Sequence, residues 1–408
     1  MVFGAVVNAS ATDFKASGSM WVGYNYLDVD NGDSGDDVNQ FKQRFRTQIE
    51  MIASENLYGV AYFEINQTWG KNDKTVEDND ENDLNIGRIG SNTGGGIGAD
   101  GVNIQTRRMY VNFLVPSTTV NVRAGIQGLA LPSAVAGSPV LDDDVAAIVA
   151  SSSYNGVNLT GFFARPYDSD HAETTVDLFG AVVSAEINGA TVTPYVMFAN
   201  AGSSNADFNR DAQWYGAAVT LAPISDFTLS FDGIYGKQAG KDAGFMVAGK
   251  AAYAANFAAP ALVAWYASGD DDSDGGIMPT IDDGTDMTPT TLVGAGAMGP
   301  MEDAVFGSPL GKWGVSLQAE EITFIEKLSH TVRVTYIQGT NDVATSDIEN
   351  WDEDDRAVEF DVVNVYSMYD NLDFIVDLAY AATDFDNNNA AEDTDGVFKA
   401  AALVQYNF

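Results

Sequence analysis

The stretch Gly396-Val-Phe-Lys-Ala-Ala-Ala-Leu-Val-Gln-Tyr-Asn-Phe408 decides how the rest of the chain is interpreted. Every second residue counted back from Phe408 is apolar, whereas Asn407, Gln405 and Lys399 lie among the intervening positions. This alternation predicts a β-strand with one apolar face. A half-buried edge strand of a soluble protein would show the same pattern, so the surroundings of this strand can be inferred only from the rest of the chain.

The same alternation recurs along the chain from Thr12, in segments bounded by short turns on one side and longer, acidic loops on the other. About eighteen strands are predicted, with sixteen as the alternative, at 12–28, 39–54, 57–70, 101–115, 119–130, 145–155, 157–167, 175–187, 190–200, 211–222, 227–237, 244–255, 259–269, 312–326, 328–339, 356–369, 371–384 and 397–408.

Asn155-Gly156 and Asn188-Gly189 are strong signals for two-residue hairpin turns. In segment 312–326 the apolar phase flips, which predicts a β-bulge at Glu320-Glu321. So many strands exceed what an open twisted sheet usually holds. The sequence therefore predicts an all-β fold: a transmembrane antiparallel up-and-down β-barrel.

Composition fits one barrel domain over residues 12–408. The longest apolar stretch, 251–267, is interrupted by Asn256 and Pro260, so no transmembrane helix is expected. The chain has no cysteine, which agrees with an oxidising compartment. Its formal net charge of -38 excludes nucleic acid as a partner. Residues 1–11 end in the small-residue pattern Ala9-Ser10-Ala11 and are interpreted as the remnant of a secretory signal peptide.

With its terminal phenylalanine, acidic balance, absence of cysteine and hairpins throughout, the chain resembles the general-diffusion homotrimeric porins of bacterial outer membranes, in a branch like that of sulfate-reducing bacteria. The resemblance implies a water-filled channel for passive diffusion of small hydrophilic solutes and ions. It also implies several partners: two further copies in a homotrimer, outer-membrane lipid and lipopolysaccharide, and the barrel-assembly machinery, which would recognise Phe408. A substrate-specific channel and a non-conducting surface or adhesion barrel are the alternatives.

In that family the third outer loop folds into the barrel and narrows it. The corresponding loop here is Gly128 to Asp144, which is apolar and ends in Asp142, Asp143 and Asp144. The resemblance therefore implies a pore constriction with these three aspartates on its acidic side.

Alternation within the predicted strands gives the opposing side of this constriction. Five basic residues share inward faces, where they would form a basic wall: Lys42, Arg44, Arg46, Arg108 and Arg123. Inward acids are predicted later, at Glu320, Glu359, Asp361, Asp373 and Asp377.

Other chemistry has weaker support. The two histidines, His171 and His330, fall at opposite ends of the predicted barrel, so no enzyme is expected. Asp270, Asp272 and Asp274 followed by Gly275 resemble the start of a calcium-binding loop, although Ile281 occupies the closing position. No cofactor is expected beyond this possible calcium.

Overall fold

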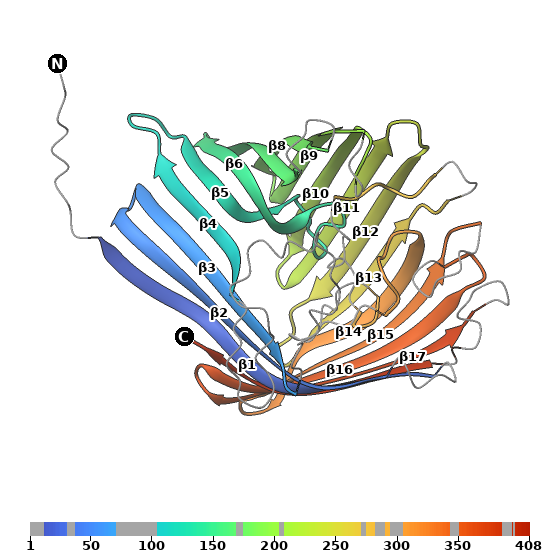
Figure 1. Ribbon diagram of the computed structural model, residues 1–408. Coiled ribbons are helices and arrows are strands. Elements are labelled where there is room, and N and C mark those ends of the chain that lie inside the picture. The colour runs from blue at the N-terminus through green and yellow to red at the C-terminus, as the bar shows by residue number, and fades with distance from the viewer. Residues whose placement is uncertain are drawn as a thin grey trace, which may run out of the picture.

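The computed structural model is a closed β-barrel (Figure 1) and describes residues 12–30, 37–70, 104–168, 174–203, 208–270, 275–281, 290–293, 305–342, 351–385, 394 and 396–408. Residues 1–11, which the sequence assigns to a signal peptide, lie outside the described part. No helix of the described chain is long and apolar enough to cross a membrane.

The described residues form eighteen antiparallel strands, each paired with its neighbours in sequence, and β1 pairs with β18 to close the ring. The prediction of an up-and-down barrel is confirmed, and eighteen rather than sixteen is the strand number. The strands are β1 Asp13–Asp30, β2 Val38–Ser54, β3 Leu57–Thr68, β4 Gln105–Leu114, β5 Asn121–Ala130, β6 Asp142–Tyr154, β7 Val157–Tyr167, β8 Val176–Ile187, β9 Ala190–Ala201, β10 Ala212–Ile224, β11 Phe227–Gln238, β12 Ala243–Tyr253, β13 Ala259–Ala267, β14 Lys312–Ile325, β15 Leu328–Gly339, β16 Arg356–Tyr369, β17 Leu372–Asp384 and β18 Gly396–Asn407.

The turns follow the local sequence. Asn155 and Gly156 have φ values of 50° and 80°, as a primed hairpin turn requires, and Asn188 with Gly189 repeats this at 52° and 82°. The predicted bulge is also confirmed, because the β14–β15 register shifts between Ala319 and Ile322. Short turns therefore gather at one end of the barrel, which we call the turn end, and longer connections at the other, the loop end.

The seam of the barrel depends on a glycine. Gly18 and Phe408 exchange two backbone hydrogen bonds, of 2.9 and 3.0 Å. A Cβ atom on Gly18 would lie 2.1 Å from the carbonyl oxygen of Arg46 and 2.9 Å from the Phe408 ring. That ring stacks on Phe45 of β2, with a centroid distance of 6.0 Å. A side chain at residue 18 would therefore clash with the backbone of β2 and press on the Phe408 ring at the seam.

Side chains alternate between an inner and an outer face all round the ring. Trp21 of β1 is 5% exposed and faces inward, whereas its neighbour Met20 is 41% exposed and faces outward. Exposed apolar side chains recur on the outer face of the other strands, as a lipid-facing surface requires.

Near the loop end these outward side chains include a ring of aromatic residues, here called the aromatic belt. It comprises one residue on or directly after each of fifteen strands, β7 through β18 and then β1 to β3: Phe163, Phe179, Phe198, Tyr215, Tyr235, Phe245, Tyr266, Trp313, Tyr336, Phe360, Tyr380, Phe398, Tyr26, Phe41 and Trp69. Most neighbours in the belt are cross-strand partners, as with Phe179 and Phe198, or ring contacts, as with Phe41 and Trp69 at 5.3 Å.

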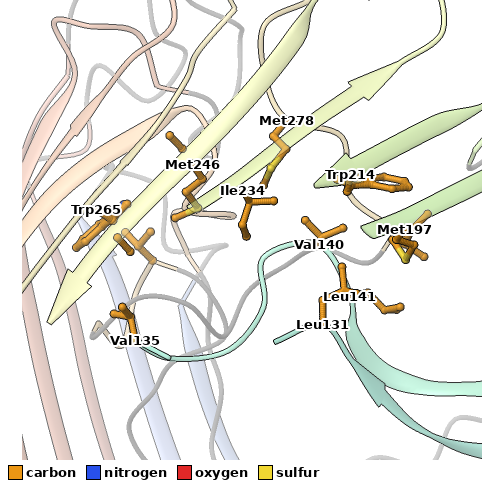
Figure 2. Close-up of a cluster of buried hydrophobic side chains, with 14 of the residues drawn as sticks. Leu131, Val135, Val140, Leu141, Met197, Trp214, Ile234, Met246, Trp265 and Met278 are labelled. Atoms are coloured by element: carbon orange, nitrogen blue, oxygen red, sulfur yellow. The ribbon is translucent and has the colours of Figure 1, made fainter. Parts of the chain in front are cut away.

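The third connection at the loop end, residues 131–141, folds into the barrel, as expected. Leu131, Val140 and Leu141 are 2%, 0% and 2% exposed. Figure 2 shows them beside Trp214 and Ile234 from the wall. We call this segment the inner loop.

A second segment enters the barrel from the connection between β13 and β14, which the sequence suggested to be a solvated acidic loop. That expectation is wrong for the described parts, because Met278, Leu292 and Phe306 are each 1% exposed or less. The stretches 275–281 and 290–293 contain apolar residues and no acidic one, and the acidic residues elsewhere in this connection hid the signal.

Candidate functional site

The inner face of β1 and β2 carries three of the predicted basic residues. Trp21 faces inward and is the cross-strand partner of Arg44, so Arg44 shares its face. Lys42 and Arg46 lie two positions away on either side and therefore face inward as well. Arg123 of β5 is opposite Asn112, which is 6% exposed and also faces inward. These four residues thus lie on the inner face, and their role as the basic wall of a pore constriction stays a prediction.

Each of three arginines lies over an aromatic ring of the neighbouring strand. The guanidinium of Arg44 is 5.3 Å from the centre of the Trp21 ring, and that of Arg123 is 5.5 Å from Tyr110. Arg108 lies 5.7 Å from its cross-strand partner Tyr62. Cation–π contact restricts such long side chains, so the charges have defined positions along the wall.

Ion pairs join this wall into a network. Glu64, 3% exposed on β3, accepts a hydrogen bond from Arg46 and lies 3.2 Å from Arg107. Arg107 Nε also donates to Asp144 at 2.8 Å, and Arg108 Nε donates to the same carboxylate at 2.6 Å. The network therefore links β2, β3, β4 and β6.

Arg107 was missed by sequence reasoning. Strict alternation places it opposite Arg108, on the outer face. The β3–β4 register, however, shifts between Tyr62 and Phe63, which leaves Arg107 as the extra residue of a bulge. The bulge lets Arg107 reach Glu64, and an uninterrupted pattern count cannot locate such an insertion.

The three aspartates are not part of the inner loop. The loop ends at Leu141, and β6 begins at Asp142, because residues 142–151 continue the ladder with β5. Val145 is 8% exposed and faces inward, so alternation places Asp144 on the other face. Asp144 does approach the basic residues, as expected, through Arg107 and Arg108. The role of Asp142, Asp143 and Asp144 in a constriction stays a prediction.

The inner loop is held by one carboxylate on β11. Asp232, 6% exposed, accepts hydrogen bonds from Ser133 Oγ at 2.7 Å, Ala134 N at 2.8 Å and Val135 N at 2.9 Å. Bonds from backbone N–H groups to a buried carboxylate are short and strong, so the loop has a fixed position across the lumen from β2.

A second carboxylate holds the other inner segment. Glu359 on β16 accepts hydrogen bonds from Thr291 N at 2.6 Å and Leu292 N at 3.1 Å. The two inner segments also meet, because Ile281 N donates to Val140 O at 2.9 Å. The interior of the barrel is therefore crossed by two connected segments, each tied to the wall.

The late acids lie on inner faces, but the central ones are covered. Glu359 and Asp361 are both 0% exposed, and Asp377 is 2% exposed with Lys399 at 3.4 Å. Glu320 lies 3.0 Å from Arg333. Glu359 thus binds an inner segment, Asp377 pairs with a buried lysine, and all three buried carboxylates present little charge to the lumen.

The calcium site stays a prediction. Asp272 and Asp274 lie outside the described residues, and among the described residues no group of three or more His, Cys, Asp or Glu side chains could hold a metal ion. Asp270 accepts a hydrogen bond from Gly275 N at 3.3 Å. Ile281, at the closing position of the motif, is 6% exposed in the core and offers no side-chain ligand.

Comparison with known proteins supports the fold. No family model matches the chain, and no curated protein sequence matches it. Among solved structures it is similar to Pseudomonas aeruginosa OpdQ, with a TM-score of 0.61, 12% identity and coverage of 97% of this chain and 99% of that one. It is also similar to P. aeruginosa OccK11 (OpdR), with a TM-score of 0.60 at 12% identity over 97% and 96% of the two chains.

The outer membrane protein OprD from P. aeruginosa gives a TM-score of 0.58 at 16% identity, over 96% of this chain and 93% of that one. At such identities the likeness is one of fold. The chain has the eighteen-stranded architecture of an outer-membrane β-barrel.

Proposed function

We propose that the chain is a passive, substrate-selective channel of the bacterial outer membrane, with preference for small hydrophilic solutes that carry an anionic group. The observation that carries this proposal is the position of the inner loop. Asp232 holds it across the lumen from an inner face on which arginines and aromatic rings alternate. A solute would have to pass between the two.

Selectivity is favoured over general diffusion because two inner segments cross the lumen and both are bonded to the wall. An eighteen-stranded barrel without such segments leaves a wide aqueous channel. With them, the passage is bordered by fixed donors, rings and charges. The resemblance to a general-diffusion branch is therefore replaced by the substrate-specific alternative.

The charge of the wall favours anions. Five cations lie along the wall, at Lys42, Arg44, Arg46, Arg107 and Arg123, and the carboxylates Glu64 and Asp144 form ion pairs with Arg46 and Arg107. Cations therefore outnumber these two carboxylates along the wall, and charge interactions in a protein-lined passage are stronger than in bulk solution. The side chains of Arg46 and Arg107 are 23% and 28% exposed, so a passing anion can reach them.

Flux through the purified protein in proteoliposomes tests the proposal. Lactate and lactamide match closely in size and differ in charge, and we expect lactate to enter several-fold faster at equal concentration. Equal rates, with flux set by solute size alone, would indicate a general-diffusion pore. The absence of both flux and conductance would indicate a non-conducting surface barrel.

The proposed location in the outer membrane also implies which molecules contact the barrel. The outward apolar surface and the aromatic belt fit contact with outer-membrane lipid and lipopolysaccharide. The packing of Phe408 against Gly18 and Phe45 at the seam supports a role of the last strand in recognition by the barrel-assembly machinery. The homotrimer remains part of the proposal as well.

A further inference from the structure

Two buried carboxyl groups lie side by side on β16, beneath the second inner segment. Glu359 and Asp361 are two positions apart on one strand, so their side chains share the inner face. Both residues are 0% exposed, and their carboxyl groups lie within hydrogen-bonding reach of each other. Without access to bulk water, ionising both of two carboxyl groups in contact costs a large free energy.

The donors around this pair leave most of its oxygen atoms unbonded. One oxygen of Glu359 accepts both hydrogen bonds from the second inner segment, from Thr291 N and Leu292 N. The other oxygen of Glu359 and both oxygens of Asp361 receive no hydrogen bond from a donor of the described chain. The Thr291 hydroxyl lies near Asp361 but outside hydrogen-bonding geometry. Buried polar atoms are normally hydrogen-bonded, so three unbonded oxygens in one place indicate that a further positive partner belongs there.

The cations nearest to the pair form ion pairs with other carboxylates. Arg333 of β15 is the cross-strand partner of Asp361 but donates to Glu320 at 3.0 Å. Lys399 of β18 lies 3.4 Å from Asp377. In the described chain this buried cluster holds four carboxyl groups against three cations: Glu320, Glu359, Asp361 and Asp377 against Lys250, Arg333 and Lys399. The cluster lacks one positive charge.

We propose that Glu359 and Asp361 share one proton, and that this proton fixes the second inner segment against the wall. A proton between the two carboxyl groups balances the charge of the cluster. Unlike a metal ion, it needs no further ligands. The bonded oxygen of Glu359 stays available to the backbone of residues 291 and 292. The proposal goes beyond the proposed function and needs only that the barrel conducts, not which solute it prefers.

Loss of the shared proton should release the segment and widen the passage. Both carboxyl groups would then be charged and in contact, and only water entering between β16 and residues 290–293 could stabilise the second charge. The ionisable groups that face the pair from neighbouring strands are Glu320 on β14, Arg333 on β15, Asp377 on β17 and Lys399 on β18, and residues 290–293 carry none. The passage should therefore be narrow while the pair holds its proton and wider at alkaline pH.

Conductance of the full chain in planar bilayers tests the proposal with one variant and one matched control. In wild type we expect single-channel conductance to rise reversibly about twofold between about pH 7.5 and about pH 9.5, a range in which ordinary Asp and Glu side chains stay ionised and ordinary Lys and Arg side chains stay charged. Asp361→Asn places an amide donor beside Glu359 at every pH, so its conductance should stay low and flat. Asp373→Asn is the control, because Asp373 lies on the inner face of β17 and accepts a hydrogen bond from Ser367 at 2.7 Å. It should keep the wild-type pH response.

Infrared spectroscopy tests the proton itself, whether or not the barrel conducts. The wild-type minus Asp361→Asn difference spectrum should contain the C=O band of a protonated carboxyl group, and the band should vanish over the pH range in which conductance rises. If Asp361→Asn fails to fold, the difference between wild-type spectra at the two ends of that range carries the same test.

Three outcomes overturn the proposal. One is a wild-type conductance that does not change with pH, and another is a pH response that persists in Asp361→Asn. The third is the absence of the carboxyl band; a conductance that then responds to calcium and EDTA would indicate a metal ion between the two groups. A barrel that conducts at no pH contradicts the proposed function alone, because the band still reports the shared proton.

Discussion

Ser133 donates its hydroxyl hydrogen to Asp232 across 99 residues of sequence, over a distance of 2.7 Å. Two backbone N–H groups next to Ser133 converge on the same carboxylate. The width of the passage therefore depends on one wall residue that is not part of the loop.

Replacing this anchor should widen the channel. We expect Asp232→Ala to raise single-channel conductance, because the inner loop loses its three bonds to β11 together. Ser133→Ala is the matched control, since it removes one bond of the three and should change conductance much less. Planar-bilayer recordings measure the conductance of each variant. Equal conductance in wild type and Asp232→Ala would mean that other contacts hold the loop.

Removing the wall charges should change ion selectivity. Arg44→Ala combined with Arg46→Ala should raise conductance and shift selectivity toward cations, because two inward positive charges and two long side chains are lost. Arg165→Ala serves as control, since Arg165 forms a 2.7 Å ion pair with Asp177 at the loop end, away from the arginine wall. Reversal potentials in a salt gradient measure the shift, and an unchanged value in the double variant contradicts the assignment of the wall.

Neutralising the aspartates should have the opposite effect. Changing Asp142, Asp143 and Asp144 to asparagine should shift selectivity toward anions, with most of the shift arising from Asp144→Asn alone. That carboxylate forms ion pairs with both Arg107 and Arg108, at 2.8 and 2.6 Å, so its loss changes the network directly. If Asp142→Asn alone shifts the reversal potential as far as Asp144→Asn does, the network is not the cause.

The barrel should lose stability when residue 18 gains a side chain. Gly18→Ala places a Cβ 2.1 Å from a backbone oxygen of Arg46, and overpacking of this kind costs about 1–3 kcal/mol or more. Gly233→Ala is the control because a Cβ there meets nothing within 4 Å. Heat modifiability on gels and thermal unfolding followed by circular dichroism compare the two. Equal stability of both variants would show that the seam adjusts without cost.

The strands and the wall could be predicted from the sequence because both depend on local alternation. Lys42, Arg44 and Arg46 follow one another at a spacing of two within a single strand, so one correct strand assignment places all three. The strand at 312–326 could be predicted in spite of its bulge at Glu321, because the flip in apolar phase is visible in the sequence.

The contacts between distant parts could not be predicted in the same way. Nothing near Ser133 indicates that its partner is Asp232, and nothing in the acidic stretch before Lys312 indicates that Thr291 binds Glu359. The position of Arg107 could not be predicted without knowing that the β3–β4 register contains a one-residue insertion. The start of β6 at Asp142 was also missed, because three consecutive aspartates resemble a loop and only the ladder with β5 shows otherwise.

The place of Asp232 in the chain sets an order on assembly. The inner loop leaves β5, but its anchor belongs to β11, the sixth strand after it in the ring. Glu359, on β16, comes later still. A barrel that grows strand by strand therefore has no fixed passage during most of its formation, since contacts so distant in sequence form only after the intervening chain is in place. The inner loop can take its final position only once β11 is in place, and the second inner segment only once β16 is.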